Sequence, residues 1–291
     1  MNRNLICLQK ACEKLNINYK VHHSSENIFE VIINNKSYLF TNWSTPLNRH
    51  SNIQINRDKD YFHTFFDGVV NMPKTKSYFN PHSDPKYDKY LSQISIAEII
   101  TDIESNFEYP MIIKKNRGSW GSNVFKVNKR HKLEKALLDI YNKFSSSYDY
   151  MALAQQYLDI ETEYRVIFYN GQLQFCYKKD IEDATFIGNL SPFHHDGAKA
   201  VLITDKSILN RIQDFCAPVF NKLEINYCGI DILIDKQNEM WLLETNSSPG
   251  YDNIIRFGYE STVVDLYQTI LKGLQEEVES SKVRKFENAK V

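Results

Sequence analysis

Two apolar segments near the C-terminal end of the chain place the tightest constraint on its fold. Residues 229–235 and 240–246 each have the length and composition of a buried β-strand, and the short polar turn between them predicts an antiparallel hairpin. Asp231 lies on the first strand, and Glu244 and Asn246 project from one face of the second, because side chains at positions i and i+2 share a face. Buried carboxylates are costly unless a cation pairs with them. The hairpin therefore predicts a Mg²⁺ site that bridges phosphates, with an ordinary charged surface hairpin as the alternative.

A second feature is a glycine-bearing turn between two short β-strands. Lys114 lies near the end of the first strand, and Gly118, Ser119 and Gly121 follow before the second strand begins. The N–H groups of such a turn can fold over phosphates, and the lysine supplies positive charge. The pattern is neither a Walker A sequence nor GxGxxG, so it predicts neither a P-loop nor a Rossmann domain. Taken alone, a Gly-Ser turn between strands is usually a plain hairpin.

Composition excludes several classes of function. The chain has 35 Lys and Arg against 36 Asp and Glu, so it lacks the basic excess of a nucleic-acid-binding protein. No apolar run approaches the length of a membrane span or a signal peptide. The five cysteines are scattered without CxxC spacing, which is typical of reduced thiols. We therefore expect a cytoplasmic protein that has neither nucleic-acid nor membrane partners.

The order of expected elements indicates the α+β class, with antiparallel sheets built from hairpins. Apolar periodicity and capping residues predict helices over residues 3–16, 57–70, 96–104, 131–144, 207–222 and 263–274. Strands are expected over residues 29–42 (a hairpin), 109–116, 123–127, 150–158, 162–179 (a hairpin), 226–235 and 239–246. Residues 181–200 form a long functional loop in this interpretation, and the charged tail after Glu276 is expected to fray.

Together these segments resemble the ATP-grasp superfamily, especially its glutathione-synthetase-like and peptide-glutamate-ligase-like branches. The resemblance covers residues 42–274, and its motifs (PMIIKKNRGSWGSNV, AQQYL, ETEYRV, GNL and DIL…LETNSSPG) occur in the family's order. It implies an ATP-grasp fold in which two α+β lobes grip ATP, with a reduced N-terminal lobe. In the D-alanine ligase branch an arginine often stands just before the first aspartate. Here Gly229 and its neighbours stand there, which argues against that branch.

The resemblance also implies roles for individual residues, with ATP and Mg²⁺ as cofactors and Mn²⁺ able to substitute. Two catalytic residues are implied, Arg165 facing the phosphates and Asn189 on a loop near the metal-bound phosphate. The implied ATP-binding residues are Lys59, Lys114, Gly118, Ser119, Gly121, the hinge residues Gln155, Gln156, Tyr157 and Leu158, and Glu163 at the ribose. The implied Mg²⁺ ligands are Asp231, Glu244 and Asn246.

Two further groups were assigned from the residues themselves. Lys178 and Lys179 end a strand near the expected phosphates. Alternation lets only one of them face ATP, and we expect it to be Lys178. His194, His195 and Asp196 could deprotonate an incoming amine or bind a substrate carboxylate, but a solvated polar loop explains them equally well.

The activity implied by the resemblance is ligation of a carboxylate to an amine through an acyl-phosphate. The acid would be an amino acid, a peptide or a related compound. A phosphotransferase of the same fold is one alternative, and a non-catalytic nucleotide-binding scaffold is another. The complete set of lysines, arginine and metal ligands argues against the scaffold.

The expected division of the chain has a short N-terminal part. The predicted units are residues 1–56 (reduced N-terminal lobe), 57–108 (linker region and lobe start), 109–158 (small lobe with the glycine flap), 159–280 (large lobe with the Mg-ATP site) and 281–291 (tail). So short a lead-in suggests an open site and a peptide or protein terminus as substrate. A homodimer could instead complete the pocket through the apolar face of Leu5, Leu8, Cys12 and Leu15, although packing of this face on the chain's own hairpin is favoured.

Overall fold

Three antiparallel sheets organise the computed structural model, which describes residues 1–118, 121, 123–145 and 148–288. The strands are β1 (Asn18–Val21), β2 (Ile28–Ile33), β3 (Lys36–Thr41), β4 (Thr75–Phe79), β5 (Met111–Lys115), β6 (Val124–Val127), β7 (Met151–Gln156), β8 (Ile160–Tyr169), β9 (Gln172–Asp180), β10 (Lys199–Leu202), β11 (Tyr227–Asp235) and β12 (Met240–Asn246). They form sheets of order β1-β2-β3, β4-β7-β5-β6 and β10-β9-β8-β11-β12. The α+β class expected from the sequence is confirmed.

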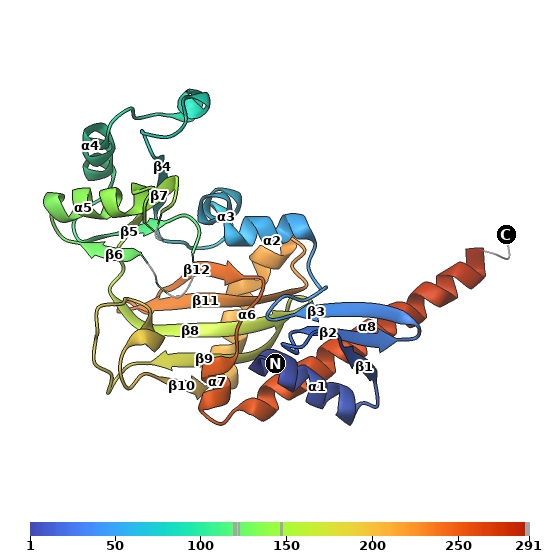
Figure 1. Cartoon of the computed structure of the whole chain (residues 1–291). Coiled ribbons are helices and arrows are strands. Elements are labelled where there is room, and N and C mark those ends of the chain that lie inside the picture. The colour runs from blue at the N-terminus through green and yellow to red at the C-terminus, as the bar shows by residue number, and fades with distance from the viewer. Residues whose placement is uncertain (119–120, 122, 146–147, 289–291) are drawn as a thin grey trace.

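Helices cover these sheets and connect them (Figure 1). The helices are α1 (Arg3–Lys14), α2 (His50–Arg57), α3 (Lys59–Phe66), α4 (Ile96–Asn106), α5 (Arg130–Tyr141), α6 (Lys206–Lys222), α7 (Asp252–Arg256) and α8 (Glu260–Asn288), with short 3-10 turns at Pro85–Tyr90 and Pro192–His194. In the described part of the chain, no helix is long and apolar enough to cross a membrane.

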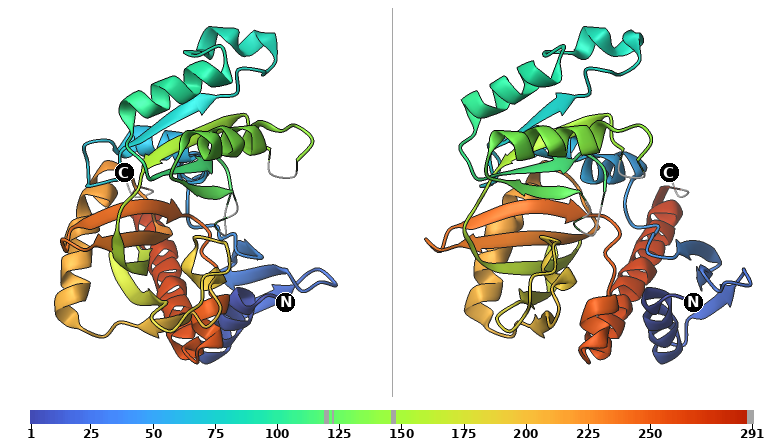
Figure 2. Two further views of the ribbon diagram at one scale, coloured as in Figure 1. Left: turned by 90° about the vertical axis from the view of Figure 1, so that its left-hand side faces the viewer. Right: turned by 60° about the vertical axis from the view of Figure 1, so that its left-hand side comes forward.

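The five-stranded sheet has a different environment on each of its faces. One face packs its alternate side chains, such as Val166 and Ile230, against α6, where Ile212 and Cys216 are fully buried. The other face packs Ile167 and Tyr177 into a second core that includes α1, α7 and α8. The right-hand view of Figure 2 shows the sheet lying between α6 and α8. The second core covers only part of its face, so the remainder is available for polar groups.

The four-stranded sheet forms a smaller lobe of its own. Helices α4 and α5 cover one of its faces, where Ile99, Ile103, Leu133 and Ile140 are fully buried. In Figures 1 and 2 this lobe lies beyond the β11–β12 edge of the five-stranded sheet, with α3 beside both. The uncovered face of the small sheet therefore looks toward the uncovered part of the large one.

The N-terminal segment packs on the C-terminal part of the chain. Leu5, Leu8 and Cys12 on α1 are at most 1% exposed and belong to the core shared with α8 and the β2–β3 hairpin. The hairpin turns at Asn34 and Asn35, whose φ angles of 50° and 64° suit a type I′ turn. The apolar face of α1 thus packs within the chain, on α8 as well as on the hairpin favoured from the sequence.

Asn4 connects α1 to the turn that follows β12. Its Nδ2 donates to the carbonyl of Pro249 (2.9 Å), and its Oδ1 accepts from the backbone N–H of Tyr251 (3.1 Å). Asn4 is 1% exposed, so water cannot replace these bonds without a local opening. A single buried amide therefore fixes the turn of residues 247–250 against the N-terminal helix.

Three expected boundaries differ from the structure. The helix expected over residues 57–70 is shorter and spans Lys59–Phe66, because Asp58 accepts from the N–H of Tyr61 (3.1 Å) and caps it there, and α2 before it was not expected. Strand β4 was not expected, and it adds to the sheet of the small lobe beside β7. The last helix begins earlier than expected, at Glu260, and continues through the expected tail to Asn288.

We predict that Asn4→Leu destabilises the protein by about 3 kcal/mol. The substitution leaves the Pro249 carbonyl and the Tyr251 N–H buried without partners, and each such group typically costs about 1–3 kcal/mol. Urea unfolding measures the difference. Ile6→Ala on the same helix is the control, because Ile6 is 37% exposed and should change stability far less. Equal effects of the two substitutions would contradict the proposed role of Asn4.

Candidate active site

A row of charged side chains crosses the open part of the large sheet. Arg165 on β8 is the register partner of Asp231 on β11, and Asp231 is the partner of Glu244 on β12. Directly opposed residues on neighbouring strands hold their side chains within contact distance on one face. The hairpin expected from the sequence thus brings Asp231 and Glu244 together, and β8 adds the arginine.

Arg165 and Asp231 form a buried network of four charges together with Lys179 and Glu163. Arg165 donates two hydrogen bonds to Asp231, from Nε to Oδ1 (2.5 Å) and from Nη2 to Oδ2 (2.8 Å). Lys179 Nζ lies 3.1 Å from Asp231 Oδ1 and also pairs with Glu163. Burial alone would raise the pKa of Asp231, but Arg165 and Lys179 outweigh it and lower that pKa. Asp231 is therefore held ionised at the centre of the sheet.

Gly229 makes room for this arginine. A Cβ at position 229 would stand 3.3 Å from Arg165 Cδ and 3.0 Å from Pro249 Cβ, so any side chain there would press on both. Because residue 229 has no side chain, Arg165 on β8 can extend its guanidinium to Asp231. The turn of residues 247–250 can also pack closely against Gly229.

The donor set beside Asp231 suits a magnesium ion that is shared with phosphates. Glu244 lies across from Asp231, and Asn246 Nδ2 donates to Glu244 Oε1 (3.3 Å). Among the described residues, no group of three His, Cys, Asp or Glu side chains is placed to hold a metal. Two carboxylates and an amide leave coordination positions for phosphate oxygens and water, as Mg²⁺ prefers. The residues therefore fit a metal that arrives with a nucleotide.

The small lobe contributes a buried lysine that faces these acids. Lys114 on β5 is 5% exposed, and its Nζ donates to Gln155 Oε1 (3.0 Å). Burial, and then the charge of Lys59, lower the pKa of Lys114 to about 7, while the charge of Glu244 acts in the opposite direction. Lys114 and Glu244 are therefore close enough to interact across the gap between the lobes.

Lys59 ties the start of α3 to the segment that follows β5. Its Nζ donates to the carbonyl of Gly118 (2.9 Å), and the N–H of Asp60 donates to Asn116 Oδ1 (2.9 Å). Arg117 reinforces the joint by pairing with Asp58 (3.2 Å). Lys59 and Lys114 thus lie close enough for their charges to interact, although they belong to different elements.

The glycine turn lies against the loop that carries Asn189. Gly121 has φ +64°, and a Cβ there would overlap Asn189 Oδ1 and stand 2.7 Å from Ser191 Cβ. The structure therefore brings Gly118, Gly121 and Asn189 to the same side of the site. Ser119, the remaining residue predicted for this turn, lies outside the described residues.

His195 serves the internal structure of the long loop. Its Nε2 donates to the carbonyl of Asn189 (3.0 Å), and its ring contacts Phe186 edge-on (5.3 Å between centroids). Asp196 forms a β-bridge with Thr185 across the base of the loop. These contacts order the loop. They do not decide between a role of residues 194–196 in binding substrate or deprotonating an amine and a solvated polar loop, so both stay predictions.

The four hinge residues fall in different places. Gln155 directs its side chain to Lys114, whereas Leu158 is buried. The N–H of Gln156 donates to the carbonyl of Lys74 (2.8 Å). Gln156 and Tyr157 line a surface hollow of about 400 Å³ whose other lining residues are Lys74, Asn106, Phe107, Glu108, Tyr109 and Pro110. The residues predicted for the hinge lie on and just after β7. Their side chains are divided between the two faces of the small sheet.

One of the predicted residues must be replaced. Lys178 pairs with Asp180 (2.9 Å) on the face of β9 opposite to the charged row, and its neighbour Lys179 enters the network instead. The choice of Lys178 was wrong for this reason, because strand alternation allows only one of the two lysines to reach the site.

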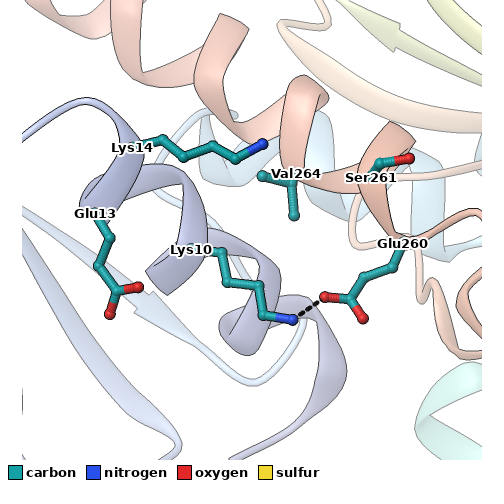
Figure 3. A pocket seen from close by; sticks show the side chains of 6 residues that line it. All are labelled: Lys10, Glu13, Lys14, Glu260, Ser261 and Val264. Atoms are coloured by element: carbon teal, nitrogen blue, oxygen red, sulfur yellow. Dashed lines mark hydrogen bonds and ion pairs between the residues drawn. The ribbon is translucent and has the colours of Figure 1, made fainter.

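A second hollow lies away from these residues. It measures about 480 Å³ between α1 and α8 and is lined by Lys10, Glu13, Lys14, Glu260, Ser261 and Val264. Figure 3 shows Lys10 reaching across it to Glu260. None of the predicted site residues lines this hollow, which is a gap between two packed helices bridged by an ion pair.

The family model of the RimK-like ATP-grasp domain matches residues 86–271. The chain belongs to this ATP-grasp family. The resemblance stated from the sequence is thereby confirmed, and so is the α+β ATP-grasp fold. The matched region contains the charged row, the glycine turn, the hinge strand and the Asn189 loop, but it begins after Lys59.

Curated relatives match the chain over part of their length. "Uncharacterized protein MG012" of Mycoplasma genitalium is 26% identical over 68% of this chain and 63% of its own length. "D-alanine--D-alanine ligase B" of Clostridium perfringens is 23% identical over 56% of this chain and 52% of its own length. The matched region thus spans less than two thirds of each relative.

Solved structures share the fold at low sequence identity. VanG D-Ala:D-Ser ligase from Enterococcus faecalis superposes with a TM-score of 0.51 at 16% identity, covering 73% of this chain and 62% of VanG. The ATP-grasp ligase PsnB, solved with a minimal precursor, gives 0.51 at 13% identity, covering 76% of this chain and 62% of PsnB.

Sequence reasoning missed three residues that the structure places in or beside the site. Strand alternation allowed either Lys178 or Lys179 to reach the site, and Lys179 was not the one predicted. His63 and Thr75 both contact Gln155, but they lie on elements whose boundaries or existence the sequence analysis did not predict correctly. The expected helix over residues 57–70 contains both Lys59 and His63, but nothing in its spacing indicates that His63 contacts the amide that holds Lys114.

We predict that Lys114→Met changes how stability depends on pH. The pKa of Lys114 is about 7 in the folded protein against 10.5 for a free lysine, so between these values the unfolded chain binds more protons and the parent gains stability as the pH rises. The variant lacks this gain. Its free energy of unfolding relative to the parent should therefore fall by about 2 kcal/mol between about pH 6 and about pH 9.

Chemical unfolding at the two pH values measures this change. The comparison isolates Lys114, because every other titrating group is present in both proteins. If the difference in unfolding free energy between variant and parent is the same at both pH values, the pKa of Lys114 is not lowered by folding. Melting with Mg-ATP adds a second readout, since the variant should lose most of the stabilisation by nucleotide.

Proposed function

We propose that the protein is an ATP-dependent carboxylate–amine ligase that works with Mg²⁺, or with Mn²⁺ in its place. The observation that carries this proposal is the row of Arg165, Asp231 and Glu244 on the large sheet, opposed by Lys114 on the small one. Two lobes that present cations and metal-binding acids to one gap suit a triphosphate, whose charge must be neutralised before transfer. Membership of the ATP-grasp family supports the same assignment.

The lysines and the glycine turn would hold the phosphates. Lys59 and Lys114 supply positive charge, and Lys59 would exchange its present bond to the Gly118 carbonyl for a phosphate oxygen. The described part of the turn, with Gly118 and Gly121, lies between them and the Asn189 loop. Charge neutralisation and positioning would be their whole contribution, since phosphoryl transfer asks little covalent chemistry of the protein.

The acids and Arg165 would organise the reacting groups. Asp231, Glu244 and Asn246 would hold Mg²⁺, for which Asp231 would exchange one of its contacts with Arg165 and Lys179. Glu163 would accept from the ribose after releasing Lys179. A carboxylate oxygen of the substrate would attack the γ-phosphorus and ADP would leave, while Arg165 would hold the charge on the acyl-phosphate that forms. The amine would then displace phosphate to give the amide.

The substrate side of the site is bordered by the N-terminal segment. Trp43 is 41% exposed and lies beside the turn after β12, with its Nε1 3.4 Å from where a Cβ of Gly250 would be. An exposed aromatic wall suits a substrate with its own contact surface, which supports a peptide or a protein terminus over a free amino acid. A free amino acid or a related acid remains the simpler alternative.

A phosphotransferase is the competing function on this fold. It would use the same metal site and lysines but would pass the γ-phosphate to a hydroxyl group. The buried Arg165 favours the ligase, because a guanidinium pairs well with the oxygens of a carboxylate or an acyl-phosphate. A non-catalytic scaffold would not need this pairing or the metal ligands.

We predict that Glu244→Gln lowers turnover at least ~100-fold with the fold intact, because it removes one anionic metal ligand. ADP release under saturating Mg-ATP measures the loss. Glu239→Gln is the matched control, since Glu239 is exposed in the turn before the same strand and touches none of the site residues. Near-normal turnover of Glu244→Gln would remove Glu244 from the metal site.

Hydroxylamine trapping tests the reaction class. Hydroxylamine attacks an acyl-phosphate and gives a hydroxamate, whereas a phosphorylated alcohol gives none. We expect hydroxamate and ADP in equal amounts when a pool of amino acids and peptides is supplied with Mg-ATP. ADP without hydroxamate would favour the phosphotransferase, and the absence of ADP with every acid would favour the scaffold.

The same assay compares substrate sizes. We expect a higher kcat/KM for peptides than for free amino acids that present the same terminal residue. Equal or better efficiency with the free amino acids would contradict the open-site interpretation while leaving the ligase assignment in place.

A further inference from the structure

A chain of hydrogen bonds holds the buried lysine of the small lobe from behind. Lys114 Nζ donates to Gln155 Oε1 (3.0 Å). The Nε2 group of the same amide contacts His63 Nε2 (3.2 Å) and donates to Thr75 Oγ1 (2.7 Å). Thr75 in turn donates its hydroxyl proton to the carbonyl of Pro73 (2.9 Å). Three elements, α3, β4 and β7, thus converge on one side-chain amide.

When Lys114 is charged, the donors and acceptors of this chain can be arranged in only one way. A lysine ammonium only donates, so the oxygen of Gln155 must face Lys114 and its NH₂ group must face His63 and Thr75. Thr75 has committed its proton to Pro73 and can only accept. His63 Nε2 must also accept, which places the proton of the neutral ring on Nδ1. Each of the two amide hydrogens then has one acceptor.

His63 meets this requirement because it stays uncharged. It is partly buried, and its burial together with the charges of Lys114 and Lys59 lowers its pKa to about 3. A protonated ring would present a second donor to the amide and a third positive charge to the two lysines. The neutral ring supplies an acceptor without either penalty.

We propose that His63 is a positioning residue for the nucleotide: by fixing the amide of Gln155, it aims the ammonium of Lys114 toward the phosphates. This inference rests on the proposed function, in which Lys114 binds ATP. Without the acceptor at position 63, the amide is free to rotate, and Lys114 loses the bond that sets its direction. An amide suits this task better than a carboxylate would, because it orients the lysine without neutralising the charge that the nucleotide needs.

The test compares three substitutions by their affinity for Mg-ADP, measured by calorimetry. His63→Leu removes the acceptor and should weaken binding about tenfold, because Lys114 then loses the fixed amide oxygen that orients its ammonium. His63→Gln offers an amide oxygen near the position of Nε2 and should restore most of the affinity. His50→Leu is the control, because His50 is exposed on α2, away from Lys114.

A double-mutant cycle separates positioning from a general effect on the fold. If His63 acts through Gln155, the combined change His63→Leu/Gln155→Leu should weaken binding no more than Gln155→Leu alone. Additive losses, or unchanged affinity in a folded His63→Leu protein, would overturn the inference. Should His63→Leu fail to fold, Thr75→Val removes the other acceptor of the same amide and is judged by the same criteria.

A spectroscopic readout keeps this inference distinct from the proposed function. In the parent, the side-chain NH₂ of Gln155 should exchange slowly with solvent in NMR spectra, and Gln155→Leu identifies its signals by their loss. His63→Leu should speed this exchange, and His63→Gln should restore it. Unchanged exchange would refute the role of His63 even if nucleotide binds. A parent that binds no nucleotide would instead refute the proposed function.

Discussion

The paired hydrogen bonds between Arg165 and Asp231 are the interaction on which the site depends. Two charges buried in a sheet repay little of their desolvation cost, so the pair adds little net stability even though removing one partner would be expensive. It survives only where strands β8 and β11 keep their register, because a slip of one residue would turn both groups into the apolar core under α6. The hydrophobic packing on both faces of the sheet thus holds the charges in place.

The local parts of this arrangement could be predicted from the sequence. The β11–β12 hairpin and its acids follow from period-two alternation and a short turn, which involve only neighbouring residues. The choice between Lys178 and Lys179 could not be made in this way, because the face taken by a strand depends on its partners. Helix α2 was missed because the residues that it buries, Asn52 and Asn56, are polar and give no apolar pattern.

The support for Lys114 shows a second limit of sequence reasoning. Its partner Gln155 was predicted to lie at the hinge, but the expected role used only the backbone of that residue. The side-chain amide is directed by His63 and Thr75, which are far from it in the chain and unremarkable in composition. Such a network follows from the packing of three elements on one another, and no spacing in the sequence encodes it.

The clamp formed by Asn4 has a consequence for the order in which the molecule assembles. The hydrogen bond to Pro249 joins residues 245 positions apart, so it closes nearly the longest loop that the chain contains. Contacts between residues so far apart in the chain form late, after the local hairpins, because closing a long loop costs more entropy. The strands that carry the acids can pair as soon as they exist, whereas the turn beside them must await the N-terminal helix. The metal-binding strands and the turn of residues 247–250 are therefore expected to form at different stages of folding.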